Sequence, residues 1–274
     1  MSTTVGIFDS GVGGLTVAGE LHRLLPALPL RYIADTACFP YGDRSEDAIR
    51  VRAMTLGERL IDEGCSLLVV ACNTASSAAL ERLRETIGVP VVGMEPPLKP
   101  AVEHSRSGRV AVLVTPATAS GARLARLYDS HATGAEVETV PTPGLADLVE
   151  SGEIDGERVE GLLRSALAEP LRRGVDQVAL GCTHSGFLRP VLERILGDAV
   201  EVVDAAEPVA RRARQQLEEH RLELPDGDGE QNVVCSVTGD PAEFEAALTR
   251  LRAGGAPLPP IRVLRDPAVL DAAR

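Results

Sequence analysis

Short, uninterrupted apolar runs alternate with amphipathic stretches along most of this 274-residue chain. The apolar runs have the length of buried strands, and the stretches between them repeat apolar residues at helical spacing. Strands separated by helices indicate parallel sheets covered on both faces, so the pattern predicts an α/β fold. The predicted strands cover residues 5–8, 30–34, 67–71, 89–93, 110–114, 137–140, 178–181 and 200–203, and the predicted helices cover 15–25, 45–62, 76–86, 159–172 and 187–196.

A low-similarity internal repeat divides the chain into two related α/β units. Residues 68–74 resemble residues 178–184, because each segment is a strand that runs into a cysteine and then into a helix. Residues 91–96 resemble residues 202–208, and their glutamates follow Cys72 and Cys182 by 23 and 25 residues. The repeat predicts two similar domains, with mainly parallel sheets flanked by helices, related by a pseudo-twofold axis.

Both cysteines directly follow predicted strands. Ligands of open α/β sheets bind at the carboxyl ends of strands, so we expect Cys72 and Cys182 to face each other across an active-site cleft between the domains. We assign residues 1–97 and 209–252 to the first domain, because a strand at 233–237 and a helix at 241–252 return to it. Residues 98–208 form the second domain, and the Pro-rich residues 253–274 form a loosely attached C-terminal tail.

The amino-acid composition limits the classes of partner and the cellular location that we expect for the protein. Forty acidic and 28 basic residues give a net charge of −12, which disfavours nucleic acid or an anionic membrane as the main partner. The longest apolar run, residues 67–72, is far shorter than the ~20 residues that cross a bilayer. The first residues also lack a signal-peptide pattern. We therefore expect a cytoplasmic protein that acts on a small molecule.

The five cysteines and the single lysine limit the kinds of reaction that the chain can catalyse. Five scattered cysteines form neither a disulfide framework nor a CxxC metal pattern, so an important cysteine acts as a free thiol. Lys99 is the chain's single lysine and lies between Pro97 and Pro100, in an expected turn. Pyridoxal phosphate needs a lysine for its Schiff base, so the sequence disfavours pyridoxal chemistry.

Cys72 and Cys182 are the candidate reactive thiols. Each ends a predicted strand and precedes polar residues that open a helix, a position that lowers a thiol pKa from its usual ~8.5. A single cysteine of this kind is more often an ordinary buried residue, but two in matching contexts favour a shared catalytic role. Cys38, Cys65 and Cys235 lack this context.

Two further groups accompany these thiols. His184 lies two residues after Cys182 and can exchange a proton with it. Glu150 ends the mostly apolar segment 145–150 and, taken alone, resembles a surface glutamate.

A glycine-rich turn, residues 9–14, follows the first strand and permits a second interpretation. It is half of a G-x-G-x-x-G dinucleotide fingerprint, and Asp35 stands near the position of a ribose-binding acid. Position 16 is Thr, however, and Asp9 would repel a pyrophosphate. The better physical interpretation is a carboxylate at the active edge of the sheet, together with donors in the turn for a carboxylate-bearing ligand. A nucleotide-binding or regulatory α/β protein without catalysis stays open as the alternative.

Taken together, these segments resemble the glutamate racemase family. Within the wider superfamily, an aspartate racemase is expected to carry Glu after the second Cys-Thr pair, so His184 points to glutamate. The matching segments are residues 6–15, 34–37 with 40–42, 71–76, 115–118, 181–184 and 238–241, in family order over roughly residues 5–252.

The resemblance implies a racemase without metal or pyridoxal cofactor that interconverts L- and D-glutamate for bacterial peptidoglycan. Cys72 and Cys182 are then the two acid/base thiols, Asp9 assists the first, and Glu150 and His184 assist the second. We also expect a homodimer. The residues that match substrate-binding positions are Ser10, Tyr41, Gly42, Asn73, Thr74, Thr115, Thr118 and Thr183.

The chain departs from the family pattern at two places. Ser185-Gly186 replaces an aromatic residue and a proline, and Gly121 replaces a serine. The sequence leaves open how these departures affect the pocket wall beside Cys182, but they leave the expected chemistry unchanged.

Overall fold

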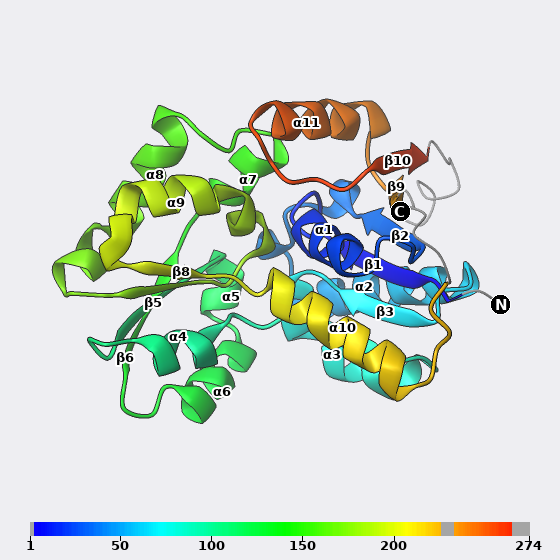
Figure 1. Cartoon of the computed structure of the whole chain (residues 1–274), viewed down its shortest axis with the longest axis horizontal. Coiled ribbons are helices and arrows are strands. Elements are labelled where there is room, and N and C mark those ends of the chain that lie inside the picture. The colour runs from blue at the N-terminus through cyan, green and yellow to red at the C-terminus, as the bar shows by residue number, and fades with distance from the viewer. Residues whose placement is uncertain (1–2, 226–232, 265–274) are drawn as a thin grey trace.

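Six parallel strands form the first sheet, in the order β10-β9-β2-β1-β3-β4. The structure is a computed structural model and describes residues 3–225 and 233–264. This sheet lies in the right half of Figure 1. Its strands are β1 (Val5–Asp9), β2 (Leu30–Ala34), β3 (Leu67–Val70), β4 (Val91–Gly93), β9 (Val233–Val237) and β10 (Ile261–Leu264).

Four parallel strands form the second sheet, in the order β6-β5-β7-β8. They are β5 (Arg109–Val114), β6 (Glu136–Pro141), β7 (Gln177–Leu180) and β8 (Glu201–Val203). This order repeats the β2-β1-β3-β4 order of the first sheet, so β3 and β7 are equivalent strands. The predicted α/β fold with two similar parallel sheets is confirmed.

Helices accompany both sheets. With the first sheet lie α1 (Leu15–Leu24), α2 (Glu46–Asp62), α3 (Asn73–Thr86), α10 (Ala206–Glu219) and α11 (Pro241–Ala253). With the second lie α4 (Leu98–His104), α5 (Pro116–Ala119), α6 (Ala122–His131), α7 (Leu145–Glu150), α8 (Glu157–Arg172) and α9 (Arg189–Leu196).

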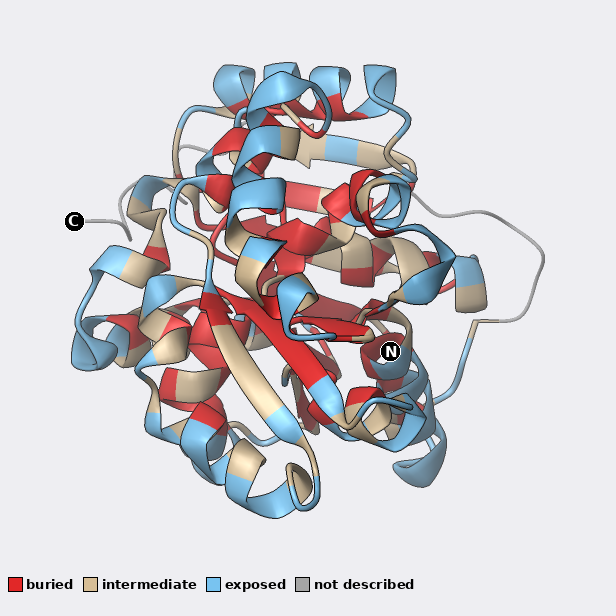
Figure 2. Ribbon diagram, turned by 90° about the vertical axis from the view of Figure 1, so that its left-hand side faces the viewer, coloured by how far each residue is buried: buried red, intermediate tan, exposed pale blue. Residues whose placement is uncertain are grey.

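The apolar strands bury both faces, as their continuous hydrophobicity predicts. Successive side chains of a strand point to opposite faces. In β1, Ile7 therefore packs in the core on the α1 and α10 side, whereas Phe8 packs in the core formed with α2 and α3. Figure 2 shows the strands as a buried layer between helices with exposed outer faces.

One hydrophobic cluster continues from the first domain into the second. It contains Val12 and Leu15 of the first domain together with Leu148 and Phe187 of the second. Apolar packing therefore holds the carboxyl ends of the two sheets against each other.

The C-terminal segment differs from the expectation of a loosely attached tail. Residues 261–264 form β10, which pairs with β9 as an edge strand of the first sheet. Prolines before the strand do not interrupt the pairing, because Pro is tolerated at strand entry and sheet edges. Residues 265–274 of the expected tail lie outside the described residues.

The surroundings of Lys99 also differ from the expected turn. Lys99 lies in the first turn of α4, where it pairs with Glu103 at 3.9 Å and is mostly exposed. Pro97 and Pro100 are compatible with this helix because the first turn needs no intrahelical donors. Lys99 does not line the cavity described below.

Candidate active site

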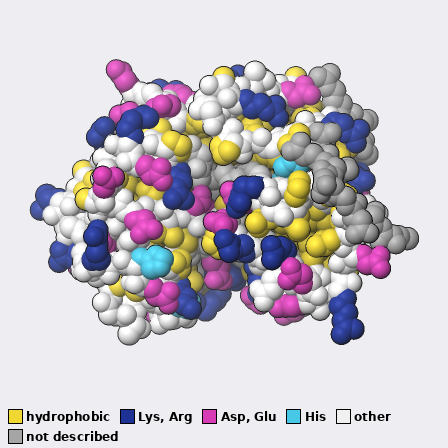
Figure 3. Space-filling model, viewed as in Figure 1, with side chains coloured by type: hydrophobic (Ala, Val, Ile, Leu, Met, Phe, Trp, Pro, Cys, Tyr) yellow, Lys and Arg dark blue, Asp and Glu magenta, His cyan; other side chains and the backbone are white. Residues whose placement is uncertain are grey.

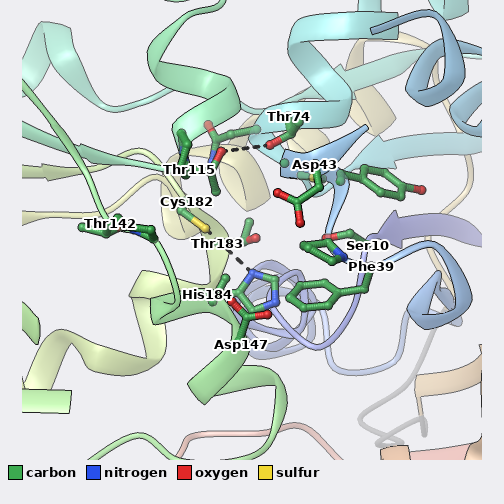
Figure 4. A pocket seen from close by; sticks show the side chains of 18 of the residues that line it. Ser10, Phe39, Asp43, Thr74, Thr115, Thr142, Asp147, Cys182, Thr183 and His184 are labelled. Carbon is green, nitrogen blue, oxygen red and sulfur yellow. Dashed lines mark hydrogen bonds between the residues drawn. The ribbon is translucent and has the colours of Figure 1, made fainter. Parts of the chain in front are cut away.

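A cavity of about 200 Å³ lies between the carboxyl ends of the two sheets, where the two cysteines were expected to meet. Both Cys72 and Cys182 line it, so the structure brings together the ends of the equivalent strands β3 and β7. Figure 4 shows side chains from both domains around this space. The other lining residues include Ser10, Phe39, Tyr41, Gly42, Asp43, Asn73, Thr74, Thr115, Thr142, Asp147, Thr183 and His184.

Cys72 is the N-cap residue of α3. Its Sγ accepts a hydrogen bond from the backbone N–H of Ala75 at 3.5 Å. This bond lowers the pKa of the Cys72 thiol, but burial and then the negative charge of Asp9 raise it more, leaving it well above its usual value. The expectation of a lowered thiol pKa is therefore wrong for Cys72 in this structure. The reason is that desolvation of the thiolate outweighs one helix N–H.

Asp9 lies behind Cys72 and is fully buried. Its Oδ2 accepts hydrogen bonds from the backbone N–H groups of Gly14 (2.9 Å) and Gly11 (3.3 Å). Its Oδ1 is buried without a hydrogen-bond partner among the described residues. Burial raises the pKa of Asp9, against the lowering effects of the His184 charge and the Gly14 N–H.

The glycine-rich turn binds protein carboxylates. Gly11 and Gly14 donate to Asp9, and the backbone N–H of Val12 donates to Glu150 Oε2 at 2.9 Å. A dinucleotide site needs these amides for its pyrophosphate. The second acid of that alternative, Asp35, is also occupied, as described below. The structure therefore favours a protein carboxylate at this edge over a nucleotide. The expectation that the turn donates to a ligand carboxylate is wrong for these three amides, because Asp9 and Glu150 accept their hydrogen bonds.

Cys182, His184 and Glu150 form a chain of polar contacts. His184 Nδ1 lies 3.8 Å from Cys182 Sγ, and its Nε2 lies 2.9 Å from Glu150 Oε2. Burial lowers the pKa of His184, but the hydrogen bonds to Cys182 and Glu150 raise it more, to well above its usual value. A protonated ring donates to both neighbours at once. The structure thus groups the three residues as the sequence predicted.

Two glycines allow this close approach between the domains. A Cβ on Gly11 would lie 2.2 Å from Glu150 Oε2, and one on Gly13 would lie 2.5 Å from both His184 Nδ1 and Thr183 Oγ1. Only a residue without a side chain fits at these distances. The glycine-rich turn of the first domain therefore packs directly against His184 and Glu150 of the second.

Polar side chains form the remaining wall. Asn73 has both side-chain polar atoms buried without partners among the described residues, although it lines the cavity. Thr74 Oγ1 contacts Thr118 Oγ1 (3.3 Å) and Thr115 Oγ1 (3.5 Å) across the domain interface. Buried polar groups are normally hydrogen-bonded, so the orphaned amide of Asn73 indicates a polar ligand.

Most of the predicted substrate-binding residues line the cavity, but Thr118 does not. Thr118 is buried and bonds to Thr74 and Thr115. Tyr41 lines the cavity but donates its hydroxyl to Asp35 Oδ2 at 2.6 Å. Thr118 and Tyr41 therefore shape the cavity through their packing or backbone, and neither offers a free hydroxyl to a ligand.

Asp35 anchors the loop of residues 36–43, which supplies one side of the cavity. Its fully buried carboxylate accepts two hydrogen bonds from Arg52 (2.6 and 2.8 Å) and one from Thr238 (2.8 Å), in addition to that from Tyr41. Thr238 Oγ1 also accepts the backbone N–H of Ala37 at 3.1 Å. The segments 34–37 and 238–241 of the family resemblance thus meet here.

Sequence reasoning missed several lining residues. Thr142 follows β6 as Asp35 follows β2, but the internal repeat seen in the sequence did not extend to these two strands. Asp43 and Asp147 are exposed acids at the cavity, and no pattern marked them. Phe39 packs its ring 5.6 Å from that of His184.

The two departures from the family pattern lie outside the cavity lining. Ser185 is buried, and Gly186 packs against Thr16 and Asp204 rather than beside the cavity. Gly121 is the N-cap of α6 and supplies no side-chain cap. None of these three residues is among the described residues that line the cavity.

On the face shown in Figure 3, basic and acidic side chains are interspersed. In residues 3–225 and 233–264, no helix has the length and hydrophobicity to cross a bilayer. Within the same residues, no group of three or more His, Cys, Asp or Glu side chains is arranged to hold a metal ion.

We compared the sequence and fold of the chain with those of known proteins. A family model described as Asp/Glu/hydantoin racemase matches residues 14–213. The chain belongs to this racemase family. A glutamate racemase from Roseiflexus sp. strain RS-1 is 44% identical to this racemase over 248 residues, which are 90% of this chain and 91% of that protein.

Solved structures agree with the fold of this racemase. Escherichia coli glutamate racemase in complex with L-glutamate and the activator UDP-MurNAc-ala has a TM-score of 0.82 at 33% identity, over 92% of this chain and 95% of that chain. Francisella tularensis glutamate racemase in complex with D-glutamate has a TM-score of 0.82 at 25% identity, over 98% and 99%. The predicted membership of the family, and with it an isomerase, is confirmed.

Proposed function

We propose that this racemase interconverts L- and D-glutamate by a two-base proton transfer at Cα. The observation that supports it best is the placement of Cys72 and Cys182 at equivalent strand ends on one cavity, each backed by its own carboxylate. The glutamate racemases among its relatives support the choice of substrate.

Inversion at Cα requires proton removal on one face and delivery on the other. One thiolate abstracts the α-proton while the opposite thiol donates, and the roles exchange in the reverse reaction. Burial keeps Cys72 protonated, whereas Cys182 lies beside a protonated His184. Burial therefore makes Cys72 the resting acid, and Cys182 is the thiol that can exchange its proton with His184.

The substrate carboxylates need donors, and the wall offers neutral ones. The residues that line the cavity include no lysine or arginine. Asn73, Ser10 and the threonines are neutral donors that can bind a carboxylate. In a cavity of this size they also stabilise the charge that develops on the α-carboxylate as Cα loses its proton.

The product D-glutamate would enter bacterial peptidoglycan, and we propose that the enzyme works in the cytoplasm as a homodimer. The net charge of −12 supports a small-molecule substrate rather than nucleic acid as the partner.

Circular dichroism tests the activity directly. We expect enzyme treated with EDTA and free of pyridoxal phosphate to abolish the signal of either glutamate enantiomer, and to act far more slowly on aspartate. Loss of signal with D-aspartate but not with D-glutamate would overturn the choice of substrate.

A second experiment tests the two bases. Each of Cys72→Ser and Cys182→Ser should lose racemisation, because a hydroxyl ionises far less readily than a thiol of pKa ~8.5. Elimination of a leaving group from C3 of a glutamate analogue needs abstraction only, so each variant should still process one enantiomer, and opposite ones. Retention of the same enantiomer by both variants would refute the opposed bases.

A further inference from the structure

A side pocket of about 560 Å³ lies behind the catalytic histidine, and Glu150 lines it rather than the substrate cavity. We define the side pocket by Asp147, Glu150, Asp240, Glu243, Ala246 and Arg250. Phe39 and Asp147 border both spaces, so they form the wall between them.

We propose that the side pocket is a proton port for Cys182: when Cys182 takes the α-proton, His184 releases its Nε2 proton through Glu150 to water in the side pocket. The inference rests on the proposed two-base function. It assigns Glu150 a proton-carrying role on the far side of His184 from the substrate.

The contacts form a continuous path. Cys182 Sγ, His184 Nδ1 and Nε2, and Glu150 Oε2 are joined by contacts of 3.8 and 2.9 Å. The side-chain exposure rises along the path from 4% at His184 to 16% at Glu150. Beyond Glu150, the side pocket is bordered by the exposed residues Asp240, Glu243 and Ala246.

The step conserves atoms and charge. The Cα–H bond breaks and an S–H bond forms at Cys182, while the Nε2–H bond of His184 breaks and an O–H bond forms at Glu150. Glu150 then passes the proton to water as hydronium. The thiolate and imidazolium become a thiol and a neutral imidazole together, and Glu150 returns to its carboxylate form. When Cys182 donates, the same proton re-enters through Glu150.

In residues 3–225 and 233–264, no comparable path leads from Cys72 to a side pocket. Asp9, behind Cys72, is fully buried and is held by the glycine-rich turn. Proton exchange at Cys72 must therefore use the substrate cavity, after the product has left. The two halves of the site are unequal in their access to water although their strands are equivalent.

The charge of the side pocket gives a selective probe. Asp147, Asp240 and Glu243 outnumber Arg250 even when Glu150 is removed. Imidazolium should therefore enter the pocket more readily than phosphate, although both buffer near neutral pH.

Chemical rescue of Glu150→Ala tests the port. We expect kcat for glutamate to fall at least about tenfold, the lower range of general acid–base effects, and to recover severalfold with imidazole at constant pH and ionic strength. KM for glutamate should not change with imidazole, because imidazole enters the side pocket. Phosphate should rescue poorly.

Matched variants locate the point of entry. In the Glu150→Ala background, Ala246→Leu should weaken the rescue by filling the side pocket, whereas Ala242→Leu, exposed on the same helix and outside the pocket lining, should not. Asp9→Ala should not respond to imidazole. Glu150→Gln keeps a hydrogen-bond acceptor for His184 but cannot carry a proton, so its kcat should also fall.

Three results would overturn the port: wild-type kcat in Glu150→Gln, imidazole that competes with glutamate, or equal rescue of Asp9→Ala. Failure of rescue in a folded Glu150→Ala enzyme would do the same. A wild-type protein that does not racemise glutamate would instead overturn the proposed function, so the two failures are distinguishable.

Discussion

Glu150 Oε2 accepts a hydrogen bond from the backbone N–H of Val12 at 2.9 Å, so a carboxylate of the second domain is held by the glycine-rich turn of the first. The same oxygen is also the hydrogen-bond partner of His184 Nε2. The orientation of the histidine beside Cys182 therefore depends on the closure of one domain against the other.

Gly13→Ala should disrupt this arrangement. The new Cβ would lie 2.5 Å from His184 Nδ1 and from Thr183 Oγ1, so the wall beside Cys182 must move. Displacement of about 1 Å can cost about 100-fold in rate, and we expect a decrease of that order in kcat/KM. In Gly161→Ala, on α8, the Cβ meets no atom within 4 Å, and this control should keep full activity. Equal losses in both variants would contradict the role of the turn.

The thiols of Cys72 and Cys182 should differ in reactivity. Burial and the charge of Asp9 raise the pKa of Cys72, whereas Cys182 is only half-buried and lies 3.8 Å from His184 Nδ1. Partial alkylation with iodoacetamide followed by peptide mapping should find Cys182 modified first. His184→Asn should slow labelling at Cys182 only. Burial raises the pKa of Cys65 to about 12, so Cys65 serves as an unreactive reference in the same digest. Preferential labelling of Cys72 would contradict the assignment of acid and base.

Arg52→Met should loosen the loop of residues 36–43. Asp35 is fully buried, and loss of its cationic partner typically costs about 3–5 kcal/mol. We expect this loss in urea unfolding, together with a raised KM for glutamate. Arg50→Met is the control on the same helix, because Arg50 pairs with Glu46 and Asp47 at the surface, where pairs contribute about 0–1 kcal/mol. The explanation fails if the two variants lose equal stability.

Much of the fold could be predicted because the apolar runs are continuous. The predicted strand at residues 30–34 agrees with β2 residue for residue, and the internal repeat identified β3 and β7 as equivalent. The helix α5 was not predicted, since four residues carry little periodicity, and α6 was not predicted either. β10 was missed because prolines surround it, although pairing with β9 outweighs that signal.

The residues of the candidate site could also be predicted only in part. Cys72, Cys182 and His184 stand in recognisable local patterns, whereas Asp43 and Asp147 reach the cavity only through the packing of loops from two domains. The high pKa of Cys72 was also beyond the sequence, because it depends on burial and on Asp9, which is 63 residues away in the chain.

Ionisation of the buried Asp9 carboxyl should destabilise the folded protein. Burial raises the pKa of Asp9 above its unfolded value of ~3.9. Between these two pKa values the folded state holds a proton that the unfolded state has lost, so the stability of the wild type falls as the pH rises through this window. Asp9→Asn removes the titrating group. The free energy of unfolding of the variant, relative to wild type, should therefore increase from about pH 4 toward neutrality, while its kcat falls.

Urea unfolding of both proteins between pH 4 and pH 7 measures this difference, and racemisation measured in parallel checks the loss of activity. Asp155→Asn supplies a control of opposite sign, because hydrogen bonds from Arg194 and from the Gly156 N–H lower the pKa of this exposed carboxyl. That variant should lose stability relative to wild type as the pH rises, and by little, since exposed charges are screened. A relative stability of Asp9→Asn that stays flat or decreases with pH would show that the folded protein does not raise the pKa of Asp9. The carboxylate behind Cys72 would then be ionised at no cost to the fold.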